Sequence, residues 1–205
     1  QKLSEANANC KEVAGRLTAT RRKAATTVER GMKDRLVPLG IPKVRFSISI
    51  EPREFQRDGC DAVAFLFSAN SSSDMMPISQ VASGGEIARV MLSLKAMISN
   101  AVKLPTIIFD EIDTGVSGKI AEKMALIMQE MAQSERQVIS ITHLPQIAAR
   151  GTTHYKVYKE ETENGTESTM TRLNDEQRVN EIAQMLSGSD ITDAAKHNAK
   201  DLLGA

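Results

Sequence analysis

Small and apolar residues recur every seven positions along the first part of the chain. The positions are Leu3, Cys10, Leu17 and Ala24, interleaved with Ala6 and Val13. This spacing predicts a coiled-coil seam of about three to four heptads. The pattern fades at Gly31 and stops before the stretch 38–42, which reads PLGIP and breaks helices. We therefore expect residues 1–37 to be the end of a coiled-coil helix that belongs to a longer one. A single amphipathic helix packed on its own domain is the alternative.

Beyond this helix, the pattern of apolar and polar residues predicts two strands first and then a succession of helices and strands. Apolar and polar residues alternate over 44–50, and an apolar run fills 62–67, so we expect two strands there. The segments that follow are a helix around 87–98, a strand at 106–109, a helix around 120–131 and a strand at 138–141. Such alternation predicts an α/β fold with a parallel sheet. The remaining pattern predicts strands at about 153–159 and 167–173 around Asn164-Gly165, then helices at about 175–187 and 191–203.

Composition places the chain among ordinary globular proteins. Its 205 residues are 41% hydrophobic and 25% charged, which excludes wholesale disorder. No apolar run approaches the roughly 20 residues that span a bilayer, so we expect no membrane association. Two cysteines, Cys10 and Cys60, give neither a disulfide framework nor a metal-binding spacing. A soluble protein of a reducing compartment is the expectation.

The zero net charge hides an asymmetry. Residues 1–45 hold 11 Lys and Arg against 4 Asp and Glu, an excess of seven positive charges. Since Lys+Arg and Asp+Glu both total 26, the rest of the chain carries an excess of seven negative charges. A basic end on an acidic body favours a polyanionic partner at that end. An ordinary solvated helix surface accounts for the charge equally well.

The stretch 81–89, VASGGEIAR, has the composition of an anion-binding helix start. Ser83 is a good N-cap, and Glu86, three residues later, completes a capping box. Gly84 and Gly85 leave the amides of the first turn unscreened by side chains, and the positive end of the helix dipole lies there. An ordinary capped helix that happens to contain two glycines is the alternative.

Acidic residues and a histidine follow two of the predicted strands. Asp110 and Glu111 come directly after the strand 106–109, and His143 follows the strand 138–141. The carboxyl ends of strands are where α/β sheets bind ligands. There Asp110 could bind Mg²⁺ together with phosphate oxygens, Glu111 could orient or deprotonate a water, and His143 could contact a γ-phosphate. The alternatives are two acids that cap a loop and a structural histidine.

In this order and spacing, the motifs resemble those of the ABC-type ATPases. SGGE is similar to the signature motif, IIFDE to Walker B, DTGVSG to the D-loop, and His143 to the switch histidine. The longer stretches VASGGEIARVMLSLK, FDEIDTGVSG and QVISITHLPQIAA resemble the RecN family of bacterial DNA repair proteins, which are relatives of the SMC proteins. Ser117 stands where many ABC proteins end the D-loop in Asp, and Ala82 where Leu commonly precedes SGG. Both forms look usual for the RecN branch.

The resemblance implies a fold, an activity and a site. Residues 38–205 would form the C-terminal lobe of an ABC-type, P-loop NTPase-like ATPase head, preceded by the coiled-coil helix 1–37. The cofactors would be ATP and Mg²⁺, and two heads would sandwich the nucleotides in a homodimer. The resemblance gives Glu111 and His143 catalytic roles and gives the metal to Asp110. The implied nucleotide-binding positions are Ser83, Gly84, Gly85, Glu86, Asp113 and Ser117.

The family's task, by the same resemblance, is DNA double-strand break repair and recombination. DNA would then be the polymer partner, and the location would be cytoplasmic and nucleoid-associated. Candidate phosphate contacts are Arg16, Arg21, Arg22 and Lys23.

One ATPase motif is missing from the sequence. A P-loop needs G-x-x-x-x-G-K-[ST], but the one Gly-Lys pair, Gly118-Lys119, is followed by Ile120, and Asp113 stands in place of the first glycine. The resemblance therefore implies that the chain is a C-terminal half, with the P-loop on its own N-terminal ATPase lobe, and that this fragment alone is inactive. The head of another SMC-like or ABC-type ATPase, and a non-enzymatic DNA- or protein-binding module, remain alternatives.

Overall fold

The chain folds as two compact units, one ending at Ala101 and the other beginning at Val102. The computed structural model describes residues 2–81, 83–102, 104–133, 136–162, 165–188 and 190–204. Ala82 of the predicted signature motif and Asn164 of the predicted turn lie outside the described residues. We describe each unit by itself.

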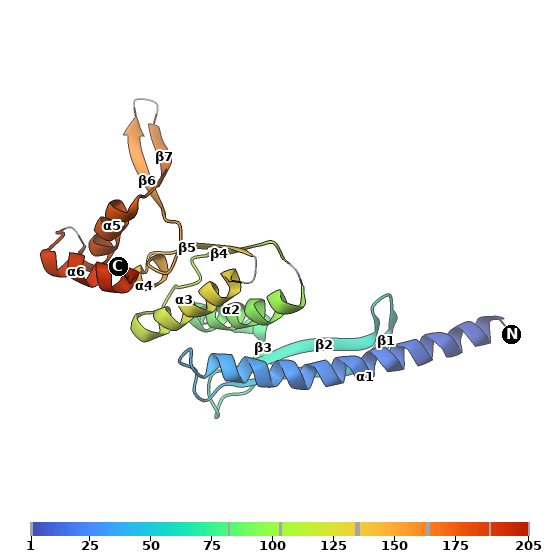
Figure 1. The fold of residues 1–205 in the computed structure, drawn as a ribbon. Coiled ribbons are helices and arrows are strands. Elements are labelled where there is room, and N and C mark those ends of the chain that lie inside the picture. Colours follow the sequence, from blue (N-terminus) through green and yellow to red (C-terminus); the bar gives the residue numbers. More distant parts are fainter. Residues whose placement is uncertain are drawn as a thin grey trace. The chain divides into compact units, whose positions relative to one another are not determined.

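The first unit is built on one long helix, α1 (Lys2–Leu36). Figure 1 shows the strands β1 (Arg45–Gln56) and β2 (Gly59–Ser68) running alongside it. The helix therefore lies within the first unit. The predicted breaker holds, because the helix ends at Leu36 and residues 37–40 form a turn. Helix α1 continues through Gly31, where the heptad pattern fades.

Helix α1 buries four side chains, and the predicted seam, which has no partner helix in the described part of this chain, stays mostly exposed. The buried residues are Ala14, Ala25, Met32 and Leu36. Of the predicted seam, Leu3 is 76% exposed, Val13 is 53% exposed, and Cys10 and Ala24 are also exposed. The second half of α1 thus packs on its own unit, as the amphipathic alternative expected. The apolar positions of the first half lie on the surface of the described structure.

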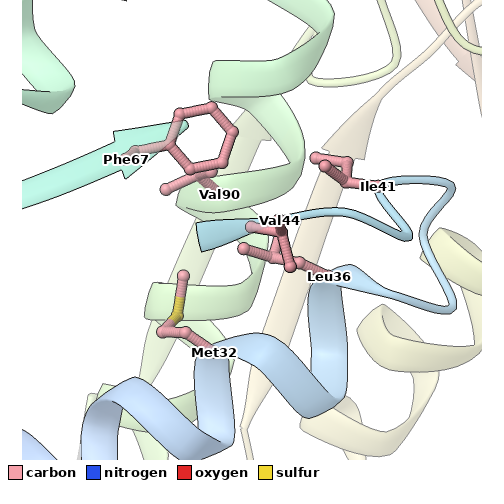
Figure 2. Packing of buried hydrophobic residues seen from close by; sticks show 6 residues of the cluster. All are labelled: Met32, Leu36, Ile41, Val44, Phe67 and Val90. Atoms are coloured by element: carbon pink, nitrogen blue, oxygen red, sulfur yellow. The ribbon is translucent and has the colours of Figure 1, made fainter. Parts of the chain in front are cut away.

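The core of the first unit joins α1 to an antiparallel sheet and to a second helix. The strands β1, β2 and β3 (Met76–Pro77) pair antiparallel, and a short 3-10 helix (Ile78–Gln80) leads towards α2 (Gly84–Ala101). Figure 2 shows six buried side chains of this core, contributed by α1, the segment after it, β2 and α2: Met32, Leu36, Ile41, Val44, Phe67 and Val90. Their packing fixes the start of α2, where the first candidate motif lies.

The second unit contains the predicted parallel pair, β4 (Thr106–Asp110) and β5 (Gln137–Ile141). Helix α3 (Gly118–Ala132) connects the two strands and buries the row Ala121, Met124, Ala125, Met128 and Met131. One face of the pair is buried, with Ile107 at 5% and Phe109 at 1% exposure. On the opposite face Ile139 is 40% and Ile141 is 52% exposed. This half-covered sheet is unusual, because parallel sheets are normally covered on both faces.

The rest of the second unit is a hairpin and three helices. Strands β6 (Tyr155–Thr162) and β7 (Gly165–Arg172) pair antiparallel, close to the predicted ranges. Helices α4 (Pro145–Ala148), α5 (Asp175–Ser187) and α6 (Asp193–Leu203) enclose a small core: Ala149, Ile182, Ala183, Ala195 and Ala199. Lys156 of β6 forms an ion pair with Glu181 of α5, which ties the hairpin to this core. None of the described helices has the length and apolar character needed to cross a bilayer.

Candidate nucleotide-binding site

The glycine-rich motif forms the first turn of α2, as predicted. Ile87 N donates to Ser83 O at 3.0 Å, so the amides of Gly84, Gly85 and Glu86 precede the first bond of the helical ladder. The predicted capping box is not seen. Among the described residues, no hydrogen bond joins the Ser83 side chain to Glu86 N or the Glu86 side chain to Ser83 N. These amides therefore stay available at the helix start.

The surroundings of Gly84 bear on why glycine stands there. A Cβ at this position would meet no atom within 4 Å, and both Ser83 and Gly84 are exposed. Internal packing of the described chain thus does not require glycine at this position. Close approach of a ligand to the backbone is a physical reason that remains.

Two exposed carboxylates follow β4. Asp110 is the last residue of the strand, and Glu111 N donates to Ile141 O at 3.2 Å, which extends the pairing with β5. The backbone of Glu111 has φ +46°, the one positive φ among the described non-glycine residues. Thr114 Oγ1 donates to Glu111 O at 2.9 Å and holds this turn. Conformations of this kind cost on the order of 1–3 kcal/mol and cluster at functional sites.

Asp113 is buried, although the resemblance implied that it contacts the nucleotide. Its side chain is fully buried, whereas the implied nucleotide-binding role needs an accessible oxygen. Thr142 Oγ1 donates to Asp113 Oδ2, and His143 Nδ1 lies 3.5 Å from the same oxygen. Asp113 Oδ1 has no hydrogen-bond partner among the described residues. The structure therefore brings Asp113 and His143 together, through loops that follow β4 and β5.

Thr142 is the member of this cluster that sequence reasoning missed. Its hydroxyl donates to Asp113 and accepts a hydrogen bond from Leu144 N at 3.0 Å, so it links two loops. Its place directly before His143 at the end of a strand was the available signal. His143 itself keeps an exposed ring, with 67% of its side chain accessible.

Ser117 is exposed and occupies the N-cap position of α3. Its extended backbone (φ −155°) precedes Gly118, whose φ of +54° favours glycine, and its side chain makes no capping hydrogen bond. The exposed Ser117 side chain is therefore accessible to a ligand or a second subunit.

The metal expectation rests on one carboxylate. The described residues contain no group of three or more His, Cys, Asp or Glu side chains arranged to bind a metal ion. Mg²⁺ commonly takes one or two carboxylates and completes its shell with phosphate oxygens and waters. The exposed Asp110 at a strand's carboxyl end fits that requirement.

Among the candidate phosphate contacts on α1, Arg21 is already engaged. Its guanidinium donates to Asp61 Oδ2 at 2.9 Å and to Asp58 O at 2.7 Å. Arg21, with Thr18, lowers the pKa of Asp61 from its ordinary value. Arg16, Arg22 and Lys23 are exposed, so the basic surface that could meet a polyanion is narrower than predicted. The hollow at the start of α5, lined by Arg172 and Arg178 among others, contains none of the predicted site residues.

Known proteins are similar to this chain over most of its length. No protein-family model matches the chain. It is 36% identical over 192 residues to the DNA repair protein RecN of Halalkalibacterium halodurans and 39% identical over 192 residues to that of Rickettsia conorii. These alignments cover 91% and 94% of this chain but 34% and 35% of the relatives. The chain thus spans about a third of the length of these relatives.

Solved structures with a similar fold are SMC ATPase heads. The Smc head domain with a coiled coil and joint from Pyrococcus yayanosii aligns with a TM-score of 0.62 at 19% identity, over 82% of this chain and 30% of that chain. A chain studied for ATP-driven dimerization and DNA stimulated activation of SMC ATPases aligns with a TM-score of 0.57 at 18% identity, over 84% of this chain and 99% of that one. These likenesses confirm the predicted α/β head fold with a parallel sheet and a long N-terminal helix.

Proposed function

Because this chain is related to the RecN DNA repair proteins over nearly its whole length, we propose that it forms one lobe of an SMC-like ATPase head that acts in DNA double-strand break repair. The observation that carries the proposal is the carboxyl end of the β4–β5 pair. There two exposed acids and an exposed histidine follow adjacent parallel strands, in the place where α/β sheets bind ligands.

Each residue at this edge has a role that its position supports. Asp110 would hold Mg²⁺, and the metal with its nucleotide would supply charge neutralisation for phosphoryl transfer. Glu111, exposed on a turn anchored by Thr114, would orient or deprotonate the attacking water. His143 would contact the terminal phosphate with its exposed ring.

The start of α2 would serve a second nucleotide. Its free amides and the helix dipole suit a phosphate, and the open space at Gly84 permits close approach. In the proposed homodimer, Ser83, Gly84 and Gly85 of one head face the nucleotide held by the other, with Ser117 near the same interface. Glu86, half-buried in the first turn of α2, is the remaining proposed nucleotide-binding residue of this motif.

A further segment is needed to complete this head. The sequence has no P-loop, and the face of the parallel pair that carries Ile139 and Ile141 is open in the described structure. Parallel sheets are normally covered on both faces, whereas α3 accounts for one face only. We propose that a P-loop-bearing lobe of the longer protein covers this face and brings the phosphate-binding loop, so that the chain alone hydrolyses ATP poorly.

DNA is the proposed polymer partner, and the proposed setting is the cytoplasm, at the nucleoid. The exposed Arg16, Arg22 and Lys23 on α1 support an electrostatic contact with phosphates.

The test is ATP hydrolysis by this chain, by a P-loop-bearing N-terminal segment of a RecN protein, and by their mixture. We expect hydrolysis by the mixture and not by either part on its own. Strong hydrolysis by this chain alone would refute the division of the site between two lobes. A mixture that associates but stays inactive would favour a non-enzymatic binding module.

A further inference from the structure

The cluster of Asp113, Thr142 and His143 has a feature that the proposed catalytic roles do not use. Asp113 is fully buried and is not accessible to a nucleotide, yet its carboxylate lies 3.5 Å from the Nδ1 atom of an exposed histidine. Thr142 Oγ1 donates to the same carboxylate oxygen and itself accepts from Leu144 N. An ionised carboxylate only accepts hydrogen bonds.

We propose that Asp113 is the positioning residue for His143: it holds the proton of the neutral imidazole on Nδ1 and thereby fixes Nε2 as the nitrogen that meets the nucleotide. The reason is that a neutral imidazole has one donor and one acceptor nitrogen. An acceptor next to Nδ1 selects the tautomer in which Nδ1 carries the proton. The partner of one ring nitrogen commonly sets the role of the other in this way.

Thr142 makes this arrangement specific. Its hydroxyl holds the orientation of the Asp113 carboxylate, and its backbone neighbour is His143, so loop β5–α4 and the turn after β4 are locked together. The remaining acceptor, Asp113 Oδ1, is buried without a partner among the described residues.

The chain itself allows a direct test, because it has only three histidines, His143, His154 and His197. Long-range ¹H–¹⁵N correlation spectra of the ¹⁵N-labelled chain, at an alkaline pH where imidazoles are neutral, report which ring nitrogen carries the proton. We expect His143 in the Nδ1–H form, and loss of that preference in Asp113→Asn, with the signals of His154 and His197 unmoved. An Nε2–H form of His143 in the unmodified chain overturns the inference, and this result does not depend on how the variant folds.

A second readout rests on the proposed ATPase function. In the head assembled with the P-loop-bearing segment, Asp113→Asn should lower kcat by about 10- to 100-fold, as is typical when a residue that orients a metal-ligating histidine is removed. The KM for ATP should change little. Thr142→Ser, which keeps the hydroxyl, should retain activity. An active assembly whose kcat is unchanged by Asp113→Asn refutes the positioning role alone. An inactive assembly with the expected tautomer refutes the ATPase proposal and leaves the Asp113–His143 relationship standing.

Discussion

Met97 of α2 occupies the space that a side chain at Gly31 of α1 would need. A Cβ at Gly31 would lie 2.7 Å from Met97 Cε and 3.3 Å from Met97 Sδ. Glycine in the interior of a helix costs roughly 1 kcal/mol relative to alanine. A side chain at Gly31 would therefore displace the flexible end of the Met97 side chain.

A double-mutant cycle measures the contact. In a Met97→Ala background, Gly31→Ala should stabilise the chain by about 1 kcal/mol through helix propensity, whereas in the unmodified chain the gain should shrink or reverse because the Met97 methyl must move. Urea denaturation of the four proteins gives the coupling energy. Equal effects of Gly31→Ala in both backgrounds would mean that the two residues do not constrain each other.

Asp61 joins β2 to α1. It is 5% exposed and accepts hydrogen bonds from Thr18 at 2.8 Å and from Arg21 at 2.9 Å. Arg21→Ala should lower the Tm of the chain, because it leaves this buried carboxylate without its cationic partner. The matched control is Arg22→Ala, which removes an exposed cation from the same helix and should leave the Tm nearly unchanged.

The same pair of variants separates structure from DNA binding. Arg22→Ala should weaken binding to a DNA duplex and reduce its salt dependence, if α1 carries phosphate contacts. A variant of Arg22 that binds DNA as tightly as the unmodified chain, at several salt concentrations, would exclude this residue from the interface.

The open face of the parallel pair should be the surface that associates with the P-loop-bearing segment. Burying one isoleucine contributes about 1.5–3 kcal/mol, so Ile141→Ser should weaken association about 10- to 100-fold while changing the Tm of the isolated chain little. Val157→Ser is the control, since Val157 is 65% exposed on the β6–β7 hairpin. Titration calorimetry measures the association of both variants with the P-loop-bearing segment. Equal weakening by the two variants would place the contact elsewhere.

His154 should make stability depend on pH. Burial lowers the pKa of His154, and the charge of Arg178 lowers it further. The folded chain therefore binds a proton at this site less readily than the unfolded chain. As pH falls below the ordinary value of 6.5, the unfolded state gains the proton first and the free energy of unfolding decreases.

Urea denaturation at about pH 7.5 and about pH 5.5, on either side of the ordinary histidine pKa, measures this effect. His154→Gln should flatten the dependence between the two pH values. His197→Gln, which changes a side chain that is 79% exposed, should leave it in place. A dependence that survives His154→Gln would assign it to another group.

Much of this fold could be predicted from periodicity, because apolar spacing reports directly on buried faces. The parallel strands β4 and β5, the helix α3 between them and the terminal hairpin all lie close to the expected ranges. The buried face of α1 could not be predicted. The heptad pattern marked Ala24, which is exposed, whereas Ala25 is buried, because the buried face of α1 packs on β1, β2 and α2 of its own unit.

The candidate site was predictable in its residue types but not in its contacts. Motif spacing identified Asp110, Glu111 and His143 at strand ends, where the structure has them exposed. It could not show that Asp113 is buried under Thr142 and beside His143, because that contact depends on how two loops distant in sequence meet. The positive φ of Glu111 likewise follows from the turn that closes after β4 rather than from the residue itself.

Glu111 should be the acid–base residue that this chain contributes to a composite ATPase head. The most direct test of this role is the rate of ATP hydrolysis by the mixture with the P-loop-bearing segment, comparing Glu111→Gln with Glu122→Gln, a change at a half-exposed acid on α3 that lies 3.6 Å from Arg150. Glu111→Gln should lower kcat by about 100-fold or more and leave association intact, whereas Glu122→Gln should leave kcat unchanged. Undiminished hydrolysis by the Glu111→Gln mixture would contradict this role.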